Sequence, residues 1–575
     1  MNPPVHSSVS LVPPWRRHLL LGAFGLVLTG LLVRAFYVQV WARDFYRRHG
    51  DRQQIRTAIL PAHRGRLLDR AGMPLAVSAP VQAVCINPRR FHPDEAQLRQ
   101  LAKLLGKSPR ALRRQIERHR QRAFLYLARQ LPPARAEAID SLGLDGLFLR
   151  REFRRYYPTA EVTAHLLGFT DIDQHGQEGL ERRFEAQLAS VPGKIQVIRD
   201  RRGRTIEAVE AIRPSRPGHD IRLSIDRRLQ YWAYLELKRA VAEHDARGAM
   251  LVLLDARTGE VLALANQPTF NPNARAKAFK GAFRNRAVVD TFEPGSTLKP
   301  LSMACALREG VVRSATLINT RPGWLRVGRH LVRDHRNYGV LTLEGILKKS
   351  SNIGITQVAL RLSPHRFTRC LADFGLGSRA GIEFPGEATG KLPAPQGLGK
   401  FEQATLAFGY GLALSTLQLA RAYTVFADDG MLHSVTLLPR AQDDKARRVL
   451  PARIARQVRS MMEGVVSREG TAWRAKVPGY RVAGKTGTVK LAIPGGYARD
   501  RYRALFVGMA PASDPQLVLA VVIEEPRGKE YYGGQVAAPV FSRVMGFALR
   551  LLGVPPDDLP AGSKAVWVQR ASGAG

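Results

Sequence analysis

The sequence predicts a mixed α/β protein with a single N-terminal transmembrane helix. Three observations predict this: an apolar run near the N-terminus, a change to long apolar segments at Ile221, and the order of strand pair, helical block and strand pairs after it. At 575 residues the chain is long enough for two or three folded units. Its apolar content of 45% is sufficient for a real core.

The first predicted element is the membrane anchor. The apolar run Leu19–Val33 extends through Val40 if Arg34 snorkels, which gives roughly the twenty residues that a bilayer needs. A buried helix or a cleaved signal peptide gives a similar pattern, but no convincing cleavage site follows. The arginines beyond the run (Arg34, Arg43, Arg47, Arg48) outnumber Arg16 and Arg17 before it, so the positive-inside rule argues weakly against export of the C-terminal part.

The elements up to Ile221 are short. Asp69–Gly72 predicts a turn between two strands, residues 95–142 have a basic, helical pattern, and Arg213–Gly218 resembles a linker. The C-terminal part is more regular. It has a helix at Arg227–His244, a hairpin turn at Asp255–Gly259, helical patterns over Ser296–Phe426, two strands in RALFVGMAP and QLVLAVVIEEP, and an unstructured tail after Leu559.

The charge and the cysteines exclude several classes of protein. Lys and Arg number 88 against 48 Asp and Glu, which suits nucleic acid, an anionic membrane surface or an anionic polymer such as cell wall. Because no nucleic-acid-binding motif accompanies the charge, we expect no nucleic-acid partner. The chain has three cysteines that lie far apart in the sequence (Cys85, Cys305, Cys370), so we expect no disulfide scaffold. Since their spacing does not suit zinc and there is no H-E-x-x-H motif, we also expect no metal or other cofactor.

Three short motifs carry the chemistry. They are Ser296-Thr-Leu-Lys299, Ser350-Ser-Asn352 and Lys485-Thr-Gly487, each weak alone and strong together in this order. On a helix, Lys299 lies on the same face as Ser296 and can take the proton of its hydroxyl, provided that burial or a nearby charge such as Lys485 lowers its pKa.

The other motif residues have expected roles in the same reaction. Ser350 would relay a proton to the leaving amine, and Asn352 would orient the substrate and Lys299. Thr486, Gly487 and Thr488 suit an edge strand that binds an extended peptide. Backbone N–H groups of Ser296 and Thr488 would form the oxyanion hole.

A phosphate-binding loop is the alternative interpretation of one motif. Gly479–Thr486 fits G-x-x-x-x-G-K-T, and Leu251–Asp255 resembles the strand that holds Mg²⁺ in such proteins. We reject this ATPase interpretation because neither an apolar strand before the loop nor a helix after it is expected.

With these motifs, the sequence resembles the class B penicillin-binding proteins, and within them the division-specific peptidoglycan D,D-transpeptidases. Further matches are Arg64–Gly72, Arg154–Pro158, Gly176–Glu181, Asn285–Pro300, Leu341–Ile355, Phe408–Tyr423, Ala483–Lys490 and Tyr531–Phe541. The resemblance implies a cytoplasmic tail (1–18), a transmembrane anchor (19–40), an elongated α+β pedestal of the dimerisation type (41–220) and a mixed α/β penicilloyl-serine transferase domain (221–555). From the sequence itself we expect the remaining residues (556–575) to be a disordered tail.

The resemblance also implies a reaction and its partners. Ser296 would attack the D-Ala-D-Ala carbonyl of a peptidoglycan stem peptide, and β-lactams would acylate the same serine. The catalytic domain would lie outside the inner membrane at the division septum, with division-machinery membrane proteins, including a glycosyltransferase, as partners.

Several alternatives remain. An elongation-specific class B transpeptidase shares the short motifs, although Leu341–Ile355 and Phe408–Tyr423 favour division. A class D β-lactamase or β-lactam sensor lacks the long pedestal, and a bifunctional class A enzyme needs a glycosyltransferase domain that is not evident here. A non-catalytic division scaffold with a vestigial site is disfavoured because every motif residue is intact.

Overall fold

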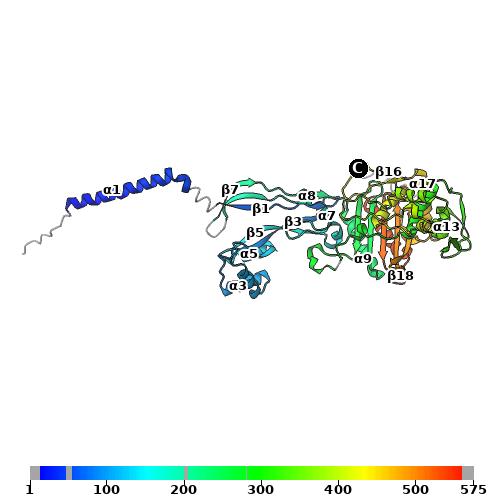
Figure 1. Cartoon of the computed structure of the whole chain (residues 1–575), viewed down its shortest axis with the longest axis horizontal. Helices are drawn as coiled ribbons and strands as arrows, with labels where there is room; N and C mark the ends of the chain where they lie inside the picture. The colour runs from blue at the N-terminus through cyan, green and yellow to red at the C-terminus, as the bar shows by residue number, and fades with distance from the viewer. Residues whose placement is uncertain (1–12, 47–54, 200–204, 280, 560–575) are drawn as a thin grey trace, which may run out of the picture. The chain divides into compact units, whose positions relative to one another are not determined.

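The structure is a computed structural model that describes residues 13–46, 55–199, 205–279 and 281–559. By its internal contacts the chain forms two compact units: residues 1–62, 80–153 and 191–217 in the first, and residues 63–79, 154–190 and 218–575 in the second. Because each unit combines segments from both sides of residue 190, the two units do not test the predicted domain boundary at residue 220, which stays a prediction. Figure 1 labels the elements along the chain.

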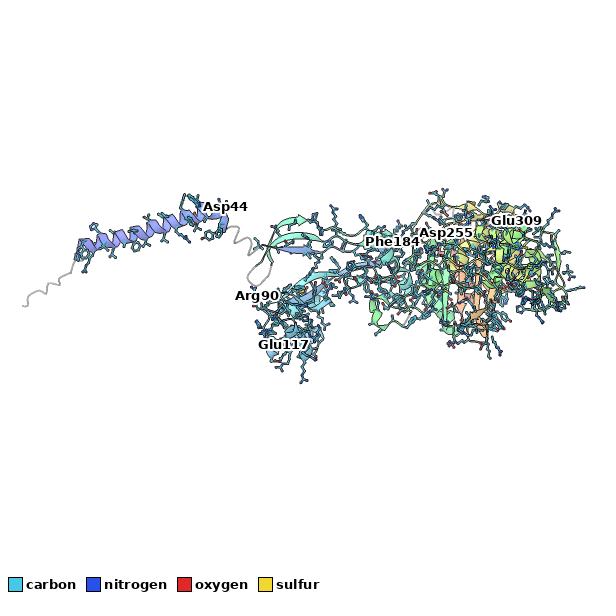
Figure 2. The ribbon with its side chains drawn as sticks, viewed as in Figure 1. Asp44, Arg90, Glu117, Phe184, Asp255 and Glu309 are labelled. Atoms are coloured by element: carbon cyan, nitrogen blue, oxygen red, sulfur yellow. A yellow bond between two sulfur atoms is a disulfide. The ribbon has the colours of Figure 1, made fainter. Side chains whose placement is uncertain are left out.

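The predicted anchor is a helix. α1 (Pro14–Phe36) begins with a proline in its first turn and continues into a π-helical turn at Tyr37–Trp41. The segment Trp15–Trp41 contains an 18-residue window with a mean hydropathy of 2.1, none of which is buried, and the side chains project around the helix in Figure 2. This N-terminal apolar helix is consistent with a single-pass anchor.

The first unit contains two small substructures. One is the antiparallel sheet β1-β6-β7 (β1 Ile55–Leu60, β6 Gly193–Arg199, β7 Thr205–Arg213). The other packs α3 (Glu95–Leu105), α4 (Pro109–Arg118) and α5 (Pro133–Asp140) around a separate core, together with β4 (Leu125–Leu131) and most of β5 (Leu147–Tyr156). The prediction of helix throughout 95–142 is therefore wrong at β4. There Leu127 and Leu131 are buried at even spacing, which suits a strand.

The predicted turn at Asp69–Gly72 is confirmed. It connects β2 (Leu67–Leu68) to β3 (Pro74–Ile86), and Asp69 Oδ1 accepts hydrogen bonds from the N–H groups of residues 71 and 73. Nearby, the buried Arg64 and Arg155 both bind Glu181, at 2.7 and 2.6 Å. A buried carboxylate needs such pairing, so Arg64 and Arg155 have a structural use in the second unit.

A five-stranded antiparallel sheet organises the second unit. Its order is β10-β9-β19-β18-β17, and the helix α9 (Arg227–Glu243) and the β9–β10 hairpin confirm the predicted elements. α9 and α18 (Gly533–Leu551) pack together against the sheet, where Trp232 stacks on Phe547. The strands are β9 (Gly248–Asp255), β10 (Val261–Gln267), β17 (Ala483–Ile493), β18 (Gly496–Ala510) and β19 (Leu517–Glu524), of which β18 and β19 were predicted from their apolar runs.

The predicted helical block lies between β10 and β17 in sequence. Over Ser296–Phe426 it comprises η4 (Gly295–Leu298), α11 (Lys299–Arg308), α12 (Leu343–Lys349), α13 (Asn352–Ala359), α14 (Pro364–Asp373), α15 (Lys400–Ala407) and α16 (Thr416–Ala427), and a further helix, α17 (Ala452–Glu463), follows the predicted block. Four short strands interrupt it, which the sequence did not indicate: β11 (Leu317–Asn319) pairs with β14 (Val340–Thr342), and β12 (Trp324–Val327) with β13 (His330–Arg333).

Two of the three cysteines are bonded. Cys305 on α11 and Cys370 on α14 form a buried disulfide across 65 residues, and Cys85 is a buried free thiol. The sequence was expected to form no disulfide scaffold, and this pair was missed. Their sequence separation gave no indication that α11 and α14 would be neighbours. The predicted tail after Leu559 lies outside the described residues.

Candidate active site

The candidate nucleophile lies in a tight turn at the wall of a cavity. Ser296 belongs to η4, directly before α11, and its half-buried side chain lines a cavity of ≈ 840 Å³. Gly295 before it has a φ of +55°, and a Cβ there would lie 2.3 Å from the side chain of Val489 on β17. Glycine at this position therefore lets the turn pack against the strand.

Lys299 is completely buried one turn later. Its Nζ donates hydrogen bonds to Ser350 Oγ at 3.1 Å and to Asn352 Oδ1 at 2.7 Å, as well as to the backbone carbonyl of Ser350. Burial lowers its pKa well below the usual value, the charge of Lys485 lowers it further, and Asp334 opposes the shift. Among the described residues, Lys299 makes no hydrogen bond to Ser296 Oγ, so the expected direct contact is replaced by contacts to the second motif.

Lys485 approaches the same hydroxyl from the sheet. It is fully buried on β17, and its Nζ lies 3.0 Å from Ser350 Oγ and 3.1 Å from the carbonyl of Thr486. Burial lowers its pKa from 10.5 to about 7. Two buried amines thus flank the hydroxyl of Ser350, and with a pKa of about 7 the amine of Lys485 is neutral in a substantial fraction of molecules near neutral pH.

The turn that carries Ser350 is held by a residue that the sequence did not indicate. Ser350 has a left-handed backbone with φ +57°, and Asp334 accepts hydrogen bonds from Ser351 Oγ and from the N–H groups of Asn352 and Ile353. Ser351 is the N-cap residue of α13, so the local sequence accounts for the start of this helix and gives no reason to expect Asp334 there. Asp334 follows β13, 17 residues before Ser351, and no local pattern links the two.

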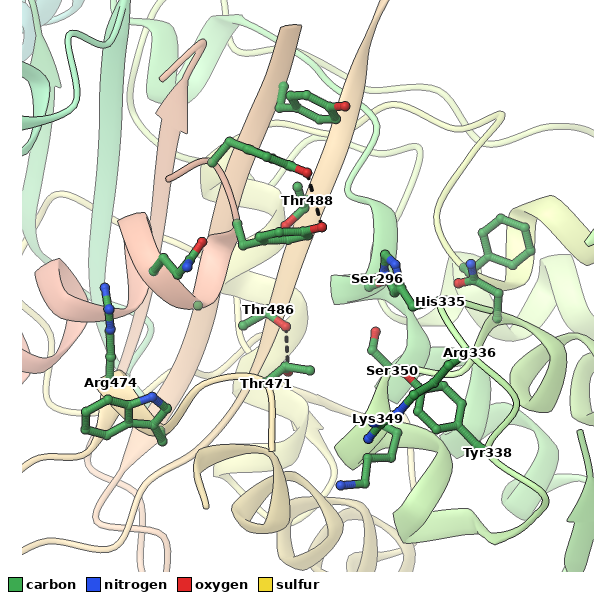
Figure 3. Close-up of a pocket in the computed structure, with 18 of the residues that line it drawn as sticks. Ser296, His335, Arg336, Tyr338, Lys349, Ser350, Thr471, Arg474, Thr486 and Thr488 are labelled. Carbon is green, nitrogen blue, oxygen red and sulfur yellow. Dashed lines mark hydrogen bonds between the residues drawn. The ribbon is translucent and has the colours of Figure 1, made fainter. Parts of the chain in front are cut away.

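The Lys-Thr-Gly motif lies on an edge strand, as expected. β17 ends the sheet order, with Gly487 opposite Leu505 of β18. A Cβ at Gly487 would lie 3.1 Å from both Pro294 O and Thr297 Cγ2, so this glycine lets the nucleophile turn approach the strand. Thr486 and Thr488 line the cavity. The hydroxyl of Thr486 is hydrogen-bonded to Thr471 Oγ1, and the hydroxyl of Thr488 accepts a hydrogen bond from the N–H of Gly533. Figure 3 shows both beside Ser296 and Ser350.

The placement of this motif excludes the phosphate-loop alternative. Gly484, Lys485 and Thr486 are inside β17 rather than in a loop that opens a helix. The preceding segment contains the short 3-10 helix Trp473–Ala475 and a turn at residues 478–479 instead of a strand. A loop that must wrap its N–H groups around phosphates cannot form from a paired strand.

The rest of the cavity wall was not evident from the sequence. Four basic side chains contribute to the lining (His335, Arg336, Lys349, Lys490), and three tyrosines stack against one another there. The rings of Tyr502, Tyr531 and Tyr532 stack in succession with centroids 4.4 Å apart. Tyr502 comes from β18, and Tyr531 and Tyr532 come from the segment just before α18. No group of three or more possible metal ligands occurs in the part of the chain that the structure describes.

Comparison with known proteins places these features in a family. The penicillin-binding protein transpeptidase domain model matches residues 249–546, and the penicillin-binding protein dimerisation domain model matches residues 59–223. These matches confirm the predicted combination of a transferase domain and an N-terminal dimerisation-type domain.

Full-length relatives agree with the domain matches. The peptidoglycan D,D-transpeptidase FtsI of Escherichia coli is 41% identical over 559 residues, covering 96% of this chain and 95% of FtsI. The probable peptidoglycan D,D-transpeptidase PbpC of Pseudomonas aeruginosa is 41% identical over 535 residues, covering 93% of this chain and 95% of PbpC. The solved transpeptidase domain of Burkholderia pseudomallei penicillin-binding protein 3 is 42% identical, with a TM-score of 0.55 over 59% of this chain and 98% of that domain. The chain therefore belongs to the penicillin-binding proteins, as a class B, FtsI-like member.

Proposed function

We propose that this protein is a serine-type peptidoglycan D,D-transpeptidase that cross-links stem peptides at the division septum and is acylated by β-lactams. The observation that carries the proposal is the pair of buried amines, Lys299 and Lys485, on either side of the Ser350 hydroxyl and next to a cavity lined by Ser296. Two relatives named peptidoglycan D,D-transpeptidases are 41% identical to this chain along nearly their whole length, which supports the same reaction here.

In the first half-reaction, Ser296 Oγ attacks the carbonyl of the penultimate D-Ala. Lys299 in its neutral form accepts the hydroxyl proton, because its lowered pKa makes the free amine available. The N–H groups of Ser296 and Thr488 would stabilise the oxyanion. When the C–N bond breaks, the leaving D-Ala nitrogen takes a proton through Ser350, whose hydroxyl contacts both amines.

In the second half-reaction, the amine of an acceptor stem peptide attacks the acyl-enzyme. Its nitrogen forms the new amide bond, its surplus proton returns to the lysine–serine network, and Ser296 leaves as a hydroxyl. A β-lactam repeats the first half only: its amide bond opens on Ser296, but the leaving nitrogen stays tethered, which hinders the approach of an acceptor.

The disulfide supports an extracytoplasmic site for the catalytic unit. Disulfides persist in oxidising compartments and are rare in the cytosol, and Cys305–Cys370 links the helix that follows Ser296 to α14. With the apolar helix α1, this favours a single-pass protein of the inner membrane with its catalytic unit in the periplasm. Division-machinery membrane proteins, including a glycosyltransferase, are its proposed partners.

A fluorescent penicillin provides the direct test. The full-length protein should form a covalent adduct that survives denaturing electrophoresis, and Ser296→Ala should abolish it. Ser141→Ala, at an exposed serine of the first unit, is the matched control and should label like the wild type. Undiminished labelling of the Ser296→Ala protein would show that another residue is the nucleophile.

A further inference from the structure

A second cavity adjoins the active-site cavity within the same unit. It has a volume of ≈ 800 Å³, and Tyr502 and Tyr531 line both cavities. These two rings are stacked with 21° between their planes, so they form a common wall. The second cavity is built by the start of β18, the segment after β19 and the residue before β9. Its charged residues are Arg247, Arg499, Arg501, Arg527, Asp500 and Glu525.

The cavity has an excess of positive charge. Arg501 and Arg247 bind the two oxygens of Glu525 at 2.7 and 2.6 Å, and these contacts hold the pKa of that carboxyl at about 2. Arg499 and Arg527 are exposed, and their guanidinium groups make no hydrogen bond or ion pair within the described ranges. Asp500, the remaining carboxylate, can balance at most one of them. At least one guanidinium is thus available for an anionic ligand.

The position of the cavity relates it to the second substrate. An extended donor peptide would lie along the edge strand β17, on the side of Ser350 and Asn352. The second cavity lies beyond the tyrosine stack, and Tyr502 belongs to β18, opposite Lys490 of β17. Because donor and acceptor are both attached to glycan strands, their chains must leave the active site in different directions.

We propose that this basic cavity binds a carboxylate of the acceptor stem peptide and so positions the acceptor amine toward the acyl-enzyme. The inference rests on the proposed function. Stem peptides carry free carboxylates, and a guanidinium binds a carboxylate through two parallel hydrogen bonds. Arg499 and Arg527 are specificity residues in this account, and neither takes part in acylation of Ser296.

The test compares acylation with transfer in the full-length protein. The double variant Arg499→Gln/Arg527→Gln is measured with a fluorescent penicillin, and then with a thioester donor and a tetrapeptide acceptor that has a free side-chain amine at its third residue. The rate of penicillin acylation should stay at the wild-type value. The acceptor concentration for half-maximal transfer should rise roughly 10- to 100-fold, the usual effect of losing hydrogen bonds to a charged group.

Two controls make the result specific. Arg369→Gln/Arg453→Gln removes two exposed arginines from α14 and α17, outside the cavity, and should change neither quantity. An acceptor with its carboxylates converted to amides should need the higher concentration even with the wild type, and the cavity variant should not raise it further. The inference is wrong if the cavity variant transfers to the carboxylate acceptor as the wild type does, or if the control pair has the same effect. Failure of the wild type to react with penicillin would instead overturn the proposed function.

Discussion

The lowered pKa of Lys485 predicts a measurable link between pH and stability. In the unfolded chain this amine has its ordinary pKa of 10.5, whereas burial in the folded protein lowers the value to about 7. Between these two pH values the unfolded state binds more protons, so the free energy of unfolding rises with pH. The cost of burying this amine therefore disappears completely only at pH values above the pKa of the unfolded chain.

The size of the effect follows from the two pKa values. For a single group with these values, stability increases by about 2 kcal/mol between pH 7 and pH 9. Lys485→Met keeps the apolar stem and removes the titrating amine, so this part of the pH dependence should disappear. The charge of Lys485 also lowers the pKa of Lys299. In the Lys485→Met variant the pKa of Lys299 should therefore be less depressed, and Lys299 should contribute less to the rise of stability with pH.

The assay is thermal unfolding of the full-length protein at pH 7, 8 and 9. The wild type should gain several degrees more than Lys485→Met across this range, and Lys400→Met, at an exposed lysine, should behave like the wild type. Superimposable pH curves for wild type and Lys485→Met would refute the argument, because they would mean that this amine keeps an ordinary pKa in the folded protein.

Three further predictions concern the surroundings of the site. Asp334→Asn should slow penicillin acylation roughly 10- to 100-fold, because the turn loses hydrogen bonds to a charged acceptor; stopped-flow acylation measures this, and an unchanged rate would contradict it. Gly487→Ala should also slow acylation, because the new Cβ would lie too close to Pro294 and Thr297 in the turn that carries Ser296. A wild-type rate would show that this turn shifts to accommodate the methyl group. Thiol alkylation of the denatured, unreduced protein from cells should detect Cys85 alone, whereas three reactive thiols would mean that Cys305–Cys370 does not form in its compartment.

The sequence by itself determined the elements whose signals are local. Apolar runs predicted α1, β18 and β19, turn residues predicted the β2–β3 and β9–β10 connections, and Thr486 and Gly487 were correctly expected on an edge strand. Each of these depends on the period and chemistry of neighbouring residues. The order of the three short motifs identified the family before any contact between them was known.

The tertiary structure decided what depends on residues distant along the chain. Lys299 and Lys485 acquire low pKa values because helices and sheet bury both amines beside one hydroxyl, and no local pattern encodes that burial. Asp334, the disulfide between α11 and α14, and the basic cavity beyond the tyrosine stack arise in the same way. Burial and charge proximity are properties of the packed chain, so the sequence specifies which groups are present, and packing sets how they titrate and what they can bind.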